Sequence, residues 1–188
     1  MGTKSVIRVE TALPQDAAAI KDLFRVTIVD TFRREGIADT HPEDIEREID
    51  TQVALLDRCI GGMVDDSTLL VARVPGDAGF VSAGTIACSS PHGILRQHLD
   101  LDDSLVREVR CAYVLPEFQG RGIGSRLFQE ILSRLSYSEI GEFALDSGYS
   151  TAQAYWARKL GPPTKVLKDY WSVGADHMIW HHRVDEFV

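Results

Sequence analysis

The sequence predicts a single α/β domain of mixed (α+β) type over residues 1–188. Two observations favour this class. Segments with the hydrophobic period of strands and of helices follow one another in the order β-α-α-β-β-β-α-β-α-β-β. In addition, no internal repeat, linker or low-complexity tract divides the chain, and 188 residues are enough to build one hydrophobic core.

The first three elements follow from hydrophobic spacing. Residues 6–10 predict a strand, and a helix is expected after Pro14, over residues 16–31, because its apolar side chains recur on one helical face. A second helix is expected over residues 40–56. Its start is indicated by Thr40 and Glu43, which have the spacing of a capping box.

Three strands are expected next, over residues 68–74, 79–89 and 104–114, because these segments are rich in β-forming residues. The short turn sequence "PGDAG" between the first two predicts a hairpin. The remaining elements are a helix over residues 123–135, a strand at 142–146, a helix at 150–160 and two closing strands at 164–168 and 177–182. Gly161 and the prolines after it end the last helix.

Composition and charge narrow the functional classes. The chain is 44% hydrophobic and 26% charged, with a formal net charge of −8. A polyanion such as nucleic acid is repelled by this charge, and no basic stripe offsets it. Acidic residues gather at 41–50 and 100–103, either as solvated surface or as a field that attracts a cationic acceptor. No apolar run is long enough to span a membrane, and residues 1–10 lack the pattern of a signal peptide, so we expect a cytoplasmic protein.

Cysteine and histidine spacing argues against a metal site. Cys59, Cys88 and Cys111 are widely spaced and have apolar neighbours, which is typical of buried free thiols. The pair His181 and His182 has no partner at a metal-ligand spacing and is expected to be solvated on a strand.

The most informative segment is "PEFQGRGIGSRLF", residues 116–128, which joins a predicted strand to a predicted helix. It is not a P-loop, because no Gly-Lys pair occurs, and it lacks the third glycine of a dinucleotide fingerprint. What remains is Gln-x-x-Gly-x-Gly. Either these glycines serve a tight turn, or they let a pyrophosphate approach the backbone N–H groups at the start of a helix.

Residues 105–161 resemble the cofactor-binding half of the GNAT superfamily of N-acetyltransferases. The shared features are a strand ending in "VLPEF", the Gln-x-x-Gly-x-Gly loop and its helix, a short strand and a further helix before "KLG". The N-terminal third matches the family only in the order of its elements. The resemblance implies a mostly antiparallel central sheet, splayed between the strand ending near Val114 and the strand at 142–146.

The resemblance also implies acetyl-CoA as co-substrate, without a metal. Carried over to this chain, the main chain of Ala112, Tyr113 and Val114 binds the pantetheine arm and the acyl carbonyl, where a backbone N–H stabilises the oxyanion. The following loop wraps the pyrophosphate, and its residues are Gln119, Gly120, Arg121, Gly122, Ile123, Gly124 and Ser125.

Two further residues are candidates for proton transfer. Glu108 matches the strand position of the catalytic glutamate in histone-acetylating members of the family. Strand alternation places Glu108, Arg110 and Ala112 on one face, which also permits an ion pair between Glu108 and Arg110. In many members of the family, a tyrosine four residues before the glycine that ends the last helix acts as the general acid. Counted back from Gly161, that position is Ala157 in this chain. Tyr155 is the nearest phenol. In the alternative interpretation, Tyr155 and Trp156 divide between packing in the core and packing against the cofactor.

These features predict an N-acetyltransferase that moves acetyl from acetyl-CoA to a primary amine by direct transfer in a ternary complex. We expect a small basic acceptor, with a protein amine as a further option. The alternatives are a non-catalytic acyl-CoA sensor and an interaction protein whose glycine loop is only a turn. The resemblance also allows a homodimer, because many family members dimerise.

Overall fold

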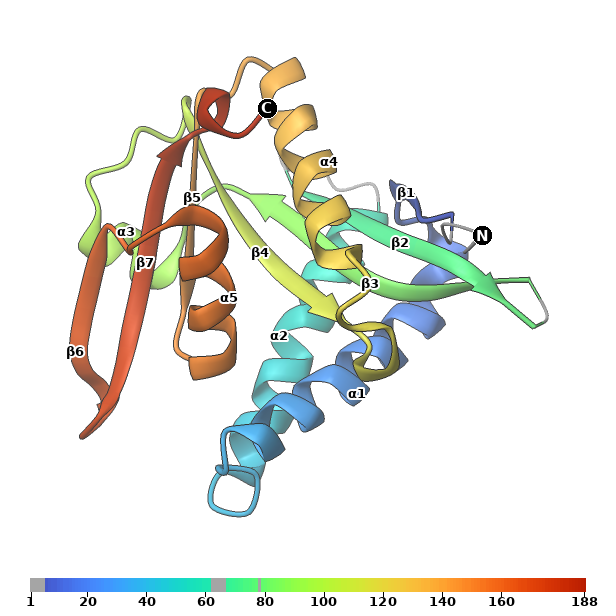
Figure 1. Cartoon of the computed structure of the whole chain (residues 1–188), viewed down its shortest axis with the longest axis horizontal. Helices are drawn as coiled ribbons and strands as arrows, with labels where there is room; N and C mark the ends of the chain where they lie inside the picture. The colour runs from blue at the N-terminus through green and yellow to red at the C-terminus, as the bar shows by residue number, and fades with distance from the viewer. Residues whose placement is uncertain (1–5, 62–66, 78) are drawn as a thin grey trace. The chain divides into compact units, whose positions relative to one another are not determined.

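The computed structural model describes residues 6–61, 67–77 and 79–188, and it confirms the mixed α/β class. Seven strands hydrogen-bond in the order β1-β2-β3-β4-β5-β7-β6 (Figure 1). The strands are β1 (Arg8–Thr11), β2 (Thr68–Gly76), β3 (Gly79–Ser89), β4 (Val106–Val114), β5 (Glu142–Ser147), β6 (Lys165–Ser172) and β7 (Ala175–Arg183). The α-helices are α1 (Ala17–Arg34), α2 (Pro42–Ile60), α3 (Gly93–His98), α4 (Ile123–Tyr137) and α5 (Ser150–Leu160).

The chain falls into two compact units. The first contains the residues up to Cys88 together with Cys111–Ile131, and the second contains Ser89–Arg110 and Leu132–Val188. Strand β4 and helix α4 each contribute residues to both units. The single domain over residues 1–188 stays a prediction.

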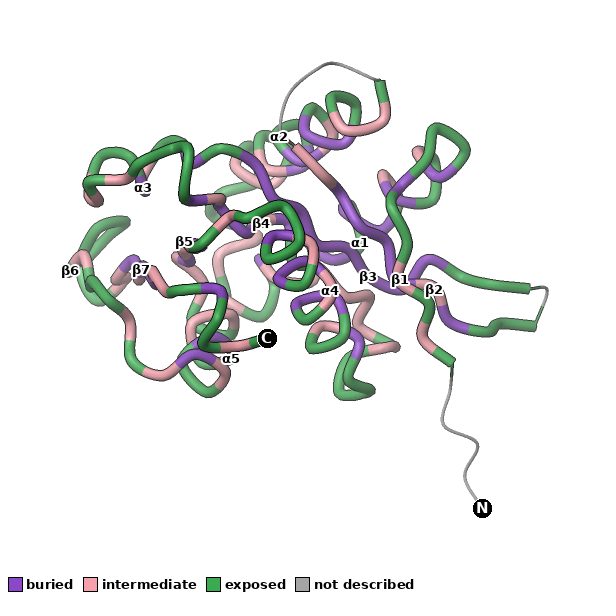
Figure 2. The backbone as a smooth tube through the Cα atoms, turned by 90° about the horizontal axis from the view of Figure 1, so that it is seen from above, coloured by how far each residue is buried: buried purple, intermediate pink, exposed green. Residues whose placement is uncertain are grey.

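In the first unit, β1 and β2 pair antiparallel, and β2 pairs antiparallel with β3. The last pair of that ladder is Gly76 with Gly79, which confirms the predicted hairpin, while Ala78 in its turn lies outside the described residues. Strands β2 and β3 are buried along most of their length (Figure 2), because β-branched and small apolar residues fill both of their faces.

Helices α1 and α2 lie side by side in the first unit (Figure 1). The apolar residues that predicted α1, among them Ile20, Phe24 and Ile28, are its buried face. The expected cap of α2 was wrong by one residue. His41 is the N-cap and Pro42 opens the helix, whereas the Thr40 hydroxyl donates to the carbonyl of Ile37.

In the second unit, β4 pairs in parallel with β5 over Val106–Glu108, and β5 and β6 both pair antiparallel with β7. The short helix α3 was not predicted. Leu95 buries it against Val106, Ala144 and Ile179. Strand β6 is exposed along most of its length, in contrast to β5 and β7 (Figure 2).

Helix α5 ends where the sequence indicated. Gly161 has a left-handed φ of 85°, a conformation that glycine adopts without a steric cost, and its carbonyl accepts a hydrogen bond from the buried Trp180 indole at 3.0 Å. In the described part of the chain, no helix combines the length and the apolar composition that crossing a membrane requires.

Candidate functional site

The glycine loop of the first unit is held open by its backbone. After β4, a short 3-10 turn over Pro116–Phe118 leads into the loop. Gly120 and Gly122 have left-handed φ angles of 73° and 82°, which other residues adopt only with strain. A Cβ added at either position would meet no atom within 4 Å. The glycines therefore serve backbone conformation and open space rather than internal packing.

The side chain of Gln119 braces this loop. Its amide nitrogen donates to the carbonyl of Val114 at 3.0 Å, and its amide oxygen accepts from Arg34 at 3.0 Å. Arg34 lies at the end of α1 and also pairs with Asp30 at 2.8 Å. Gln119 thus ties the end of β4 to α1, a role that its place in the motif did not predict.

The start of α4 favours an anion. The helix begins at Ile123, so the positive end of the helix dipole lies at the loop, and the backbone N–H groups of the first residues point toward it. All of this first turn is described, and none of its side chains is acidic. Gly124 and Ser125 lie in the turn itself, and the Arg121 guanidinium lies 5.2 Å from the centre of the Phe118 ring.

Gly84 on β3 supports the same segment, and sequence reasoning missed it. A Cβ there would lie 2.8 Å from the carbonyl oxygen of Tyr113 and 3.2 Å from side-chain atoms of Ile123 and Leu127. Only glycine lets β3 approach this closely. Its signal in the sequence was a lone glycine within a strand pattern, which indicates close backbone approach.

Strand β4 changes conformation at Cys111. This residue has a φ of 55°, unusual for a residue other than glycine, and its carbonyl accepts a hydrogen bond from the buried Thr85 hydroxyl at 3.0 Å. The alternation predicted to place Glu108 and Ala112 on one face therefore does not continue past Cys111. A left-handed residue inside a strand interrupts the period of two.

The three main-chain candidates follow this interruption. Ala112 is exposed, and Tyr113 and Val114 are half-buried. The Tyr113 hydroxyl donates to Glu48 on α2 at 2.8 Å, and its ring packs edge-on against Phe24. The side chain of Tyr113 is thus anchored to both helices, which fixes the main chain of this part of β4.

The loop fits the pyrophosphate of acetyl-CoA. Two left-handed glycines leave room that a Cβ would fill, and a helix start without acidic side chains follows them. That the residues from Gln119 to Ser125 hold this group stays a prediction. The brace from Arg34 through Gln119 keeps the loop in this conformation.

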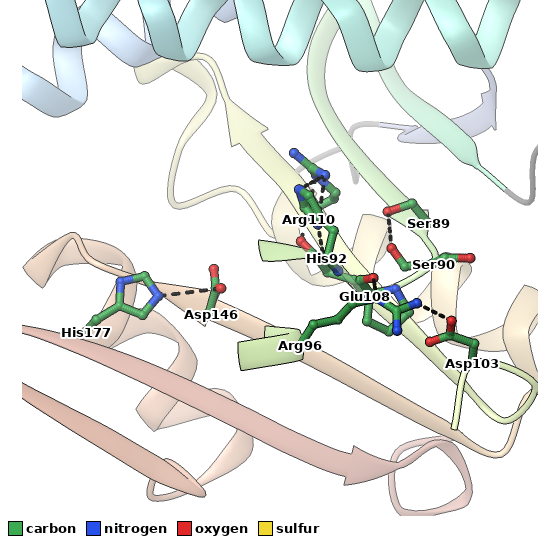
Figure 3. Close-up of polar contacts among 10 residues, drawn as sticks. Ser89, Ser90, His92, Arg96, Asp103, Glu108, Arg110, Asp146 and His177 are labelled. Atoms are coloured by element: carbon green, nitrogen blue, oxygen red, sulfur yellow. Dashed lines mark hydrogen bonds and ion pairs between the residues drawn. The ribbon is translucent and has the colours of Figure 1, made fainter. Parts of the chain in front are cut away.

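A cluster of polar side chains, here called the group around Glu108, lies in the second unit and consists of Glu108, His92 and Arg110 (Figure 3). Glu108 Oε2 accepts from the backbone N–H of His92 at 3.0 Å and lies 2.5 Å from Nδ1 of the same histidine. Arg110 Nη1 lies 2.6 Å from His92 Nε2, and Arg110 Nε lies 3.9 Å from Glu108 Oε1. Glu108 and Arg110, predicted as neighbours, are therefore joined through His92, which the sequence did not single out.

The end of β5 carries another pair. Asp146 Oδ2 lies 3.5 Å from Nε2 of the buried His177 (Figure 3). Nδ1 of His177 accepts a hydrogen bond from the Trp171 indole at 3.0 Å. The backbone of Gly148 makes room for this contact, because a Cβ there would lie 2.5 Å from the indole nitrogen. The φ angle of Gly148 is not left-handed, so its backbone conformation does not require glycine. The close approach of the Trp171 indole does.

Tyr155 and Trp156 lie on α5. Their rings pack edge-to-face with centres 4.9 Å apart, Trp156 is buried, and the hydroxyl oxygen of Tyr155 is buried as well. On the last turn of the same helix, burial lowers the pKa of Lys159. Trp156 therefore belongs to the core, and a role of Tyr155 as an acid or in cofactor packing stays a prediction.

The predicted environments of the cysteines and of His181 and His182 were partly right. All three cysteines are free thiols, with Cys88 and Cys111 buried. His181 and His182 are not simply solvated, because they pair with Glu142 at 2.7 Å and Glu186 at 3.3 Å. Over residues 6–61, 67–77 and 79–188, no three His, Cys, Asp or Glu side chains group so as to hold a metal ion.

Comparison with known proteins gives a consistent result. A search of curated proteins finds no match. Solved structures match over nearly the whole chain at low identity, which shows a shared fold. PaiA N-acetyltransferase of Thermoplasma acidophilum, in complex with coenzyme A, is 17% identical, with a TM-score of 0.65 over 95% of this chain and 99% of its own. YncA of Salmonella typhimurium, with its cofactor acetyl-CoA, is 15% identical, with a TM-score of 0.64 and coverages of 98% and 97%.

An N-acetyltransferase from Staphylococcus aureus Mu50 is 14% identical, with a TM-score of 0.63 over 96% of this chain and 99% of its own. The family model described as "Acetyltransferase (GNAT) family" matches residues 34–161, which include the glycine loop, Glu108 and Tyr155. The chain therefore belongs to the GNAT family of acetyltransferases.

Proposed function

We propose that this protein transfers acetyl from acetyl-CoA to a primary amine of a small basic acceptor, directly and within a ternary complex. The observation that carries the proposal is the glycine loop. Its left-handed Gly120 and Gly122 open a space before a helix start, where a pyrophosphate is recognised by the backbone. Two of the similar structures are N-acetyltransferases by name, which supports an amine as the acceptor.

The main chain of Ala112–Val114 binds the pantetheine arm and the acyl carbonyl in this proposal. The left-handed Cys111 supports it, because a residue of this kind inside a strand withdraws its neighbours from the regular hydrogen-bond ladder. A backbone N–H from this segment donates to the carbonyl oxygen and stabilises the negative charge that develops during attack.

Direct transfer is favoured over an acyl-enzyme. Cys88 and Cys111 are buried, and the Cys111 sulfur lies 3.9 Å from the Thr85 hydroxyl rather than beside a base. Cys59 lies on α2, a helix that carries none of the candidate site residues. A nucleophilic thiol requires an electropositive and accessible setting, which neither buried cysteine has.

The reaction moves two protons. The neutral amine attacks the acyl carbon, and the new N–C bond makes its nitrogen acidic, so that a base can remove a proton. The C–S bond then breaks, and the sulfur takes a proton. We assign the base to the group around Glu108 and the acid to Tyr155. A phenol with an ordinary pKa of about 10 suits protonation of a thiolate whose conjugate acid has a pKa of about 8.5.

The acceptor is proposed to be small and cationic. The net charge of −8 favours a positively charged partner over an anionic one. Within the second unit, the carboxylates of Glu108 and Asp146 add negative charge, which attracts an ammonium group.

The test combines binding with turnover. The wild-type protein is titrated calorimetrically with acetyl-CoA, and CoA release is followed with polyamines, aminoglycosides, amino acids and a lysine peptide. We expect acetyl-CoA to bind and at least one small amine to be acetylated. Binding without turnover of any amine would support the acyl-CoA sensor instead, and absence of binding would reduce the loop to a turn.

A further inference from the structure

His92 lies at the centre of the group around Glu108, although it belongs to a different segment of the chain. It precedes α3 with an extended backbone, at φ −146° and ψ −178°, and it contacts β4 through its backbone N–H and both ring nitrogens (Figure 3). One carboxylate oxygen of Glu108 accepts from both the backbone N–H and the ring. Because this oxygen accepts two hydrogen bonds from the same residue, it fixes the orientation of the imidazole.

The hydrogen-bond network assigns the tautomer. A guanidinium is always protonated and can only donate, so His92 Nε2, at 2.6 Å from Arg110 Nη1, must be an acceptor. Nδ1 therefore carries the hydrogen and donates to Glu108 Oε2 at 2.5 Å. The imidazole is neutral, and its only lone pair is on Nε2.

Exposure separates the two side chains. Glu108 is 6% exposed, whereas His92 is 53% exposed. An acceptor amine can therefore reach the imidazole, while Glu108 Oε2 lies behind it and already accepts two hydrogen bonds. A carboxylate in this position orients the histidine and stabilises its protonated form, but it does not itself contact the amine.

Other charged groups near His92 leave Nε2 as the reactive atom. From β4, Glu108 faces Nδ1 and Arg110 faces Nε2. From α3, Arg96 is engaged elsewhere, because its Nε donates to the carbonyl of Pro91 at 2.7 Å and its guanidinium contacts Asp103. Of these groups, only Arg110 must be displaced from Nε2 by a substrate.

We propose that His92 Nε2 takes the proton from the acceptor amine and that Glu108 is a positioning residue acting through His92. This inference rests on the amine acetylation proposed above. As the N–C bond forms, the proton passes from the nitrogen to Nε2 and the imidazole becomes an imidazolium. This transfer follows displacement of Arg110 by the bound amine, because the single lone pair of Nε2 must be released from the guanidinium before it can take a proton. The ring remains bonded to the ionised Glu108 and later releases its proton to water.

The decisive variant is His92→Asn. The asparagine amide can still donate to Glu108, so a structural role is preserved, but no basic nitrogen remains. We expect the turnover number to fall by about a hundredfold or more, with acetyl-CoA affinity and melting temperature unchanged. His98→Ala, at the other end of α3, is the matched control, and its turnover should equal that of the wild type.

Chemical rescue supplies the second measurement. In His92→Ala, added imidazole should restore turnover in proportion to its concentration. It should not restore turnover in Glu108→Gln, and it should leave the wild-type turnover of His98→Ala unchanged. Wild-type turnover in His92→Asn, or a failure of imidazole to rescue His92→Ala, would overturn this inference alone. A wild-type protein that acetylates no amine would overturn the proposed function, and this inference with it.

Discussion

The glycine loop of the first unit and the group around Glu108 in the second unit are built in opposite ways. The loop works through main chain: two left-handed glycines, a helix start and space that no side chain fills. The Glu108 group works through side chains, with His92 bridging Glu108 and Arg110. We therefore expect the loop to be disrupted by an added side chain, and the Glu108 group to be disrupted by loss of a charge or of a basic nitrogen.

This difference separates binding from chemistry. A backbone site recognises phosphate whatever the surrounding side chains are, so its loss should appear in acetyl-CoA affinity. We propose that the side-chain site moves protons, so its loss should appear in turnover at constant affinity. Gly122→Val is therefore expected to affect acetyl-CoA affinity, and Glu108→Gln is expected to affect turnover at unchanged affinity. The remaining variants are controls or affect stability.

The largest effect is expected for Gly122→Val. Valine at a φ of 82° is strained by about 1–3 kcal/mol and places its side chain where the phosphate would lie. Loss of one or two charge-assisted hydrogen bonds corresponds to a decrease in acetyl-CoA affinity of about a hundredfold. The rise in melting temperature that acetyl-CoA causes in the wild type should therefore be absent.

Gly174→Val controls for backbone strain alone. Gly174 has a φ of 80° and equally open space, but it lies between β6 and β7. It should lose a similar amount of stability and keep the melting-temperature rise with acetyl-CoA. Equal loss of that rise in both variants would show that strain, rather than the phosphate site, explains the result.

Glu108→Gln tests the other side of the comparison. Glutamine keeps the shape but cannot stabilise an imidazolium on His92 as a carboxylate does. We expect the turnover number to fall by about a hundredfold. Asp103→Asn, which alters a carboxylate paired with Arg96 on the exposed surface, should leave turnover unchanged. A variant with unchanged turnover and a lower melting temperature would assign Glu108 a purely structural role.

Two glycines outside the loop give smaller effects, on stability. Gly84→Ala places a Cβ 2.8 Å from a backbone oxygen that cannot move freely, and it should cost about 2–3 kcal/mol of unfolding free energy. Gly148→Ala displaces the Trp171 side chain instead and should cost about 1 kcal/mol. Denaturant unfolding measures both, and the reverse order would contradict this account of the two contacts.

The smallest effect concerns Asp16 in the first unit, where charge serves stability alone. Burial by itself raises the pKa of Asp16, but the hydrogen bonds from Arg73 at 2.6 Å and from Leu13 hold the pKa below its ordinary value of 3.8. This pair therefore stabilises the fold above pH 3.8, and the stabilisation is lost as the pH falls through the lowered pKa.

Asp16→Asn should lower the unfolding free energy by about 1–2 kcal/mol at pH 7, and the difference from the wild type should shrink as the pH drops below 3.8. Acetyl-CoA affinity and turnover should stay at wild-type values. A difference that persists undiminished in acid would exclude the ion pair as its cause.

The sequence predicted the backbone site better than the side-chain site, for a physical reason. Glycine spacing before an amphipathic helix is a local signal, so the loop, α4 and the hairpin of β2 and β3 were all visible. Glu108 was identified as a candidate from its place on β4. Its partner His92 lies 16 residues away on a segment without periodicity, and only the folded chain brings the two together.

Other differences between the predicted and the observed structure have similar causes. Helix α3 is only six residues long, too short for a hydrophobic period to mark it, and it is held by the burial of Leu95. The left-handed Cys111 depends on the Thr85 hydroxyl, a contact between two strands that β-propensity does not reveal. Strand alternation therefore placed Ala112 on the face of Glu108, because it assumed a regular strand.

The most direct test of the separation between binding and chemistry is a calorimetric titration of acetyl-CoA into the wild type, Gly122→Val and Glu108→Gln. The account predicts equal dissociation constants for the wild type and Glu108→Gln, and a loss of about a hundredfold or more in affinity for Gly122→Val. Wild-type affinity in Gly122→Val, or a comparable loss of affinity in Glu108→Gln, would contradict it.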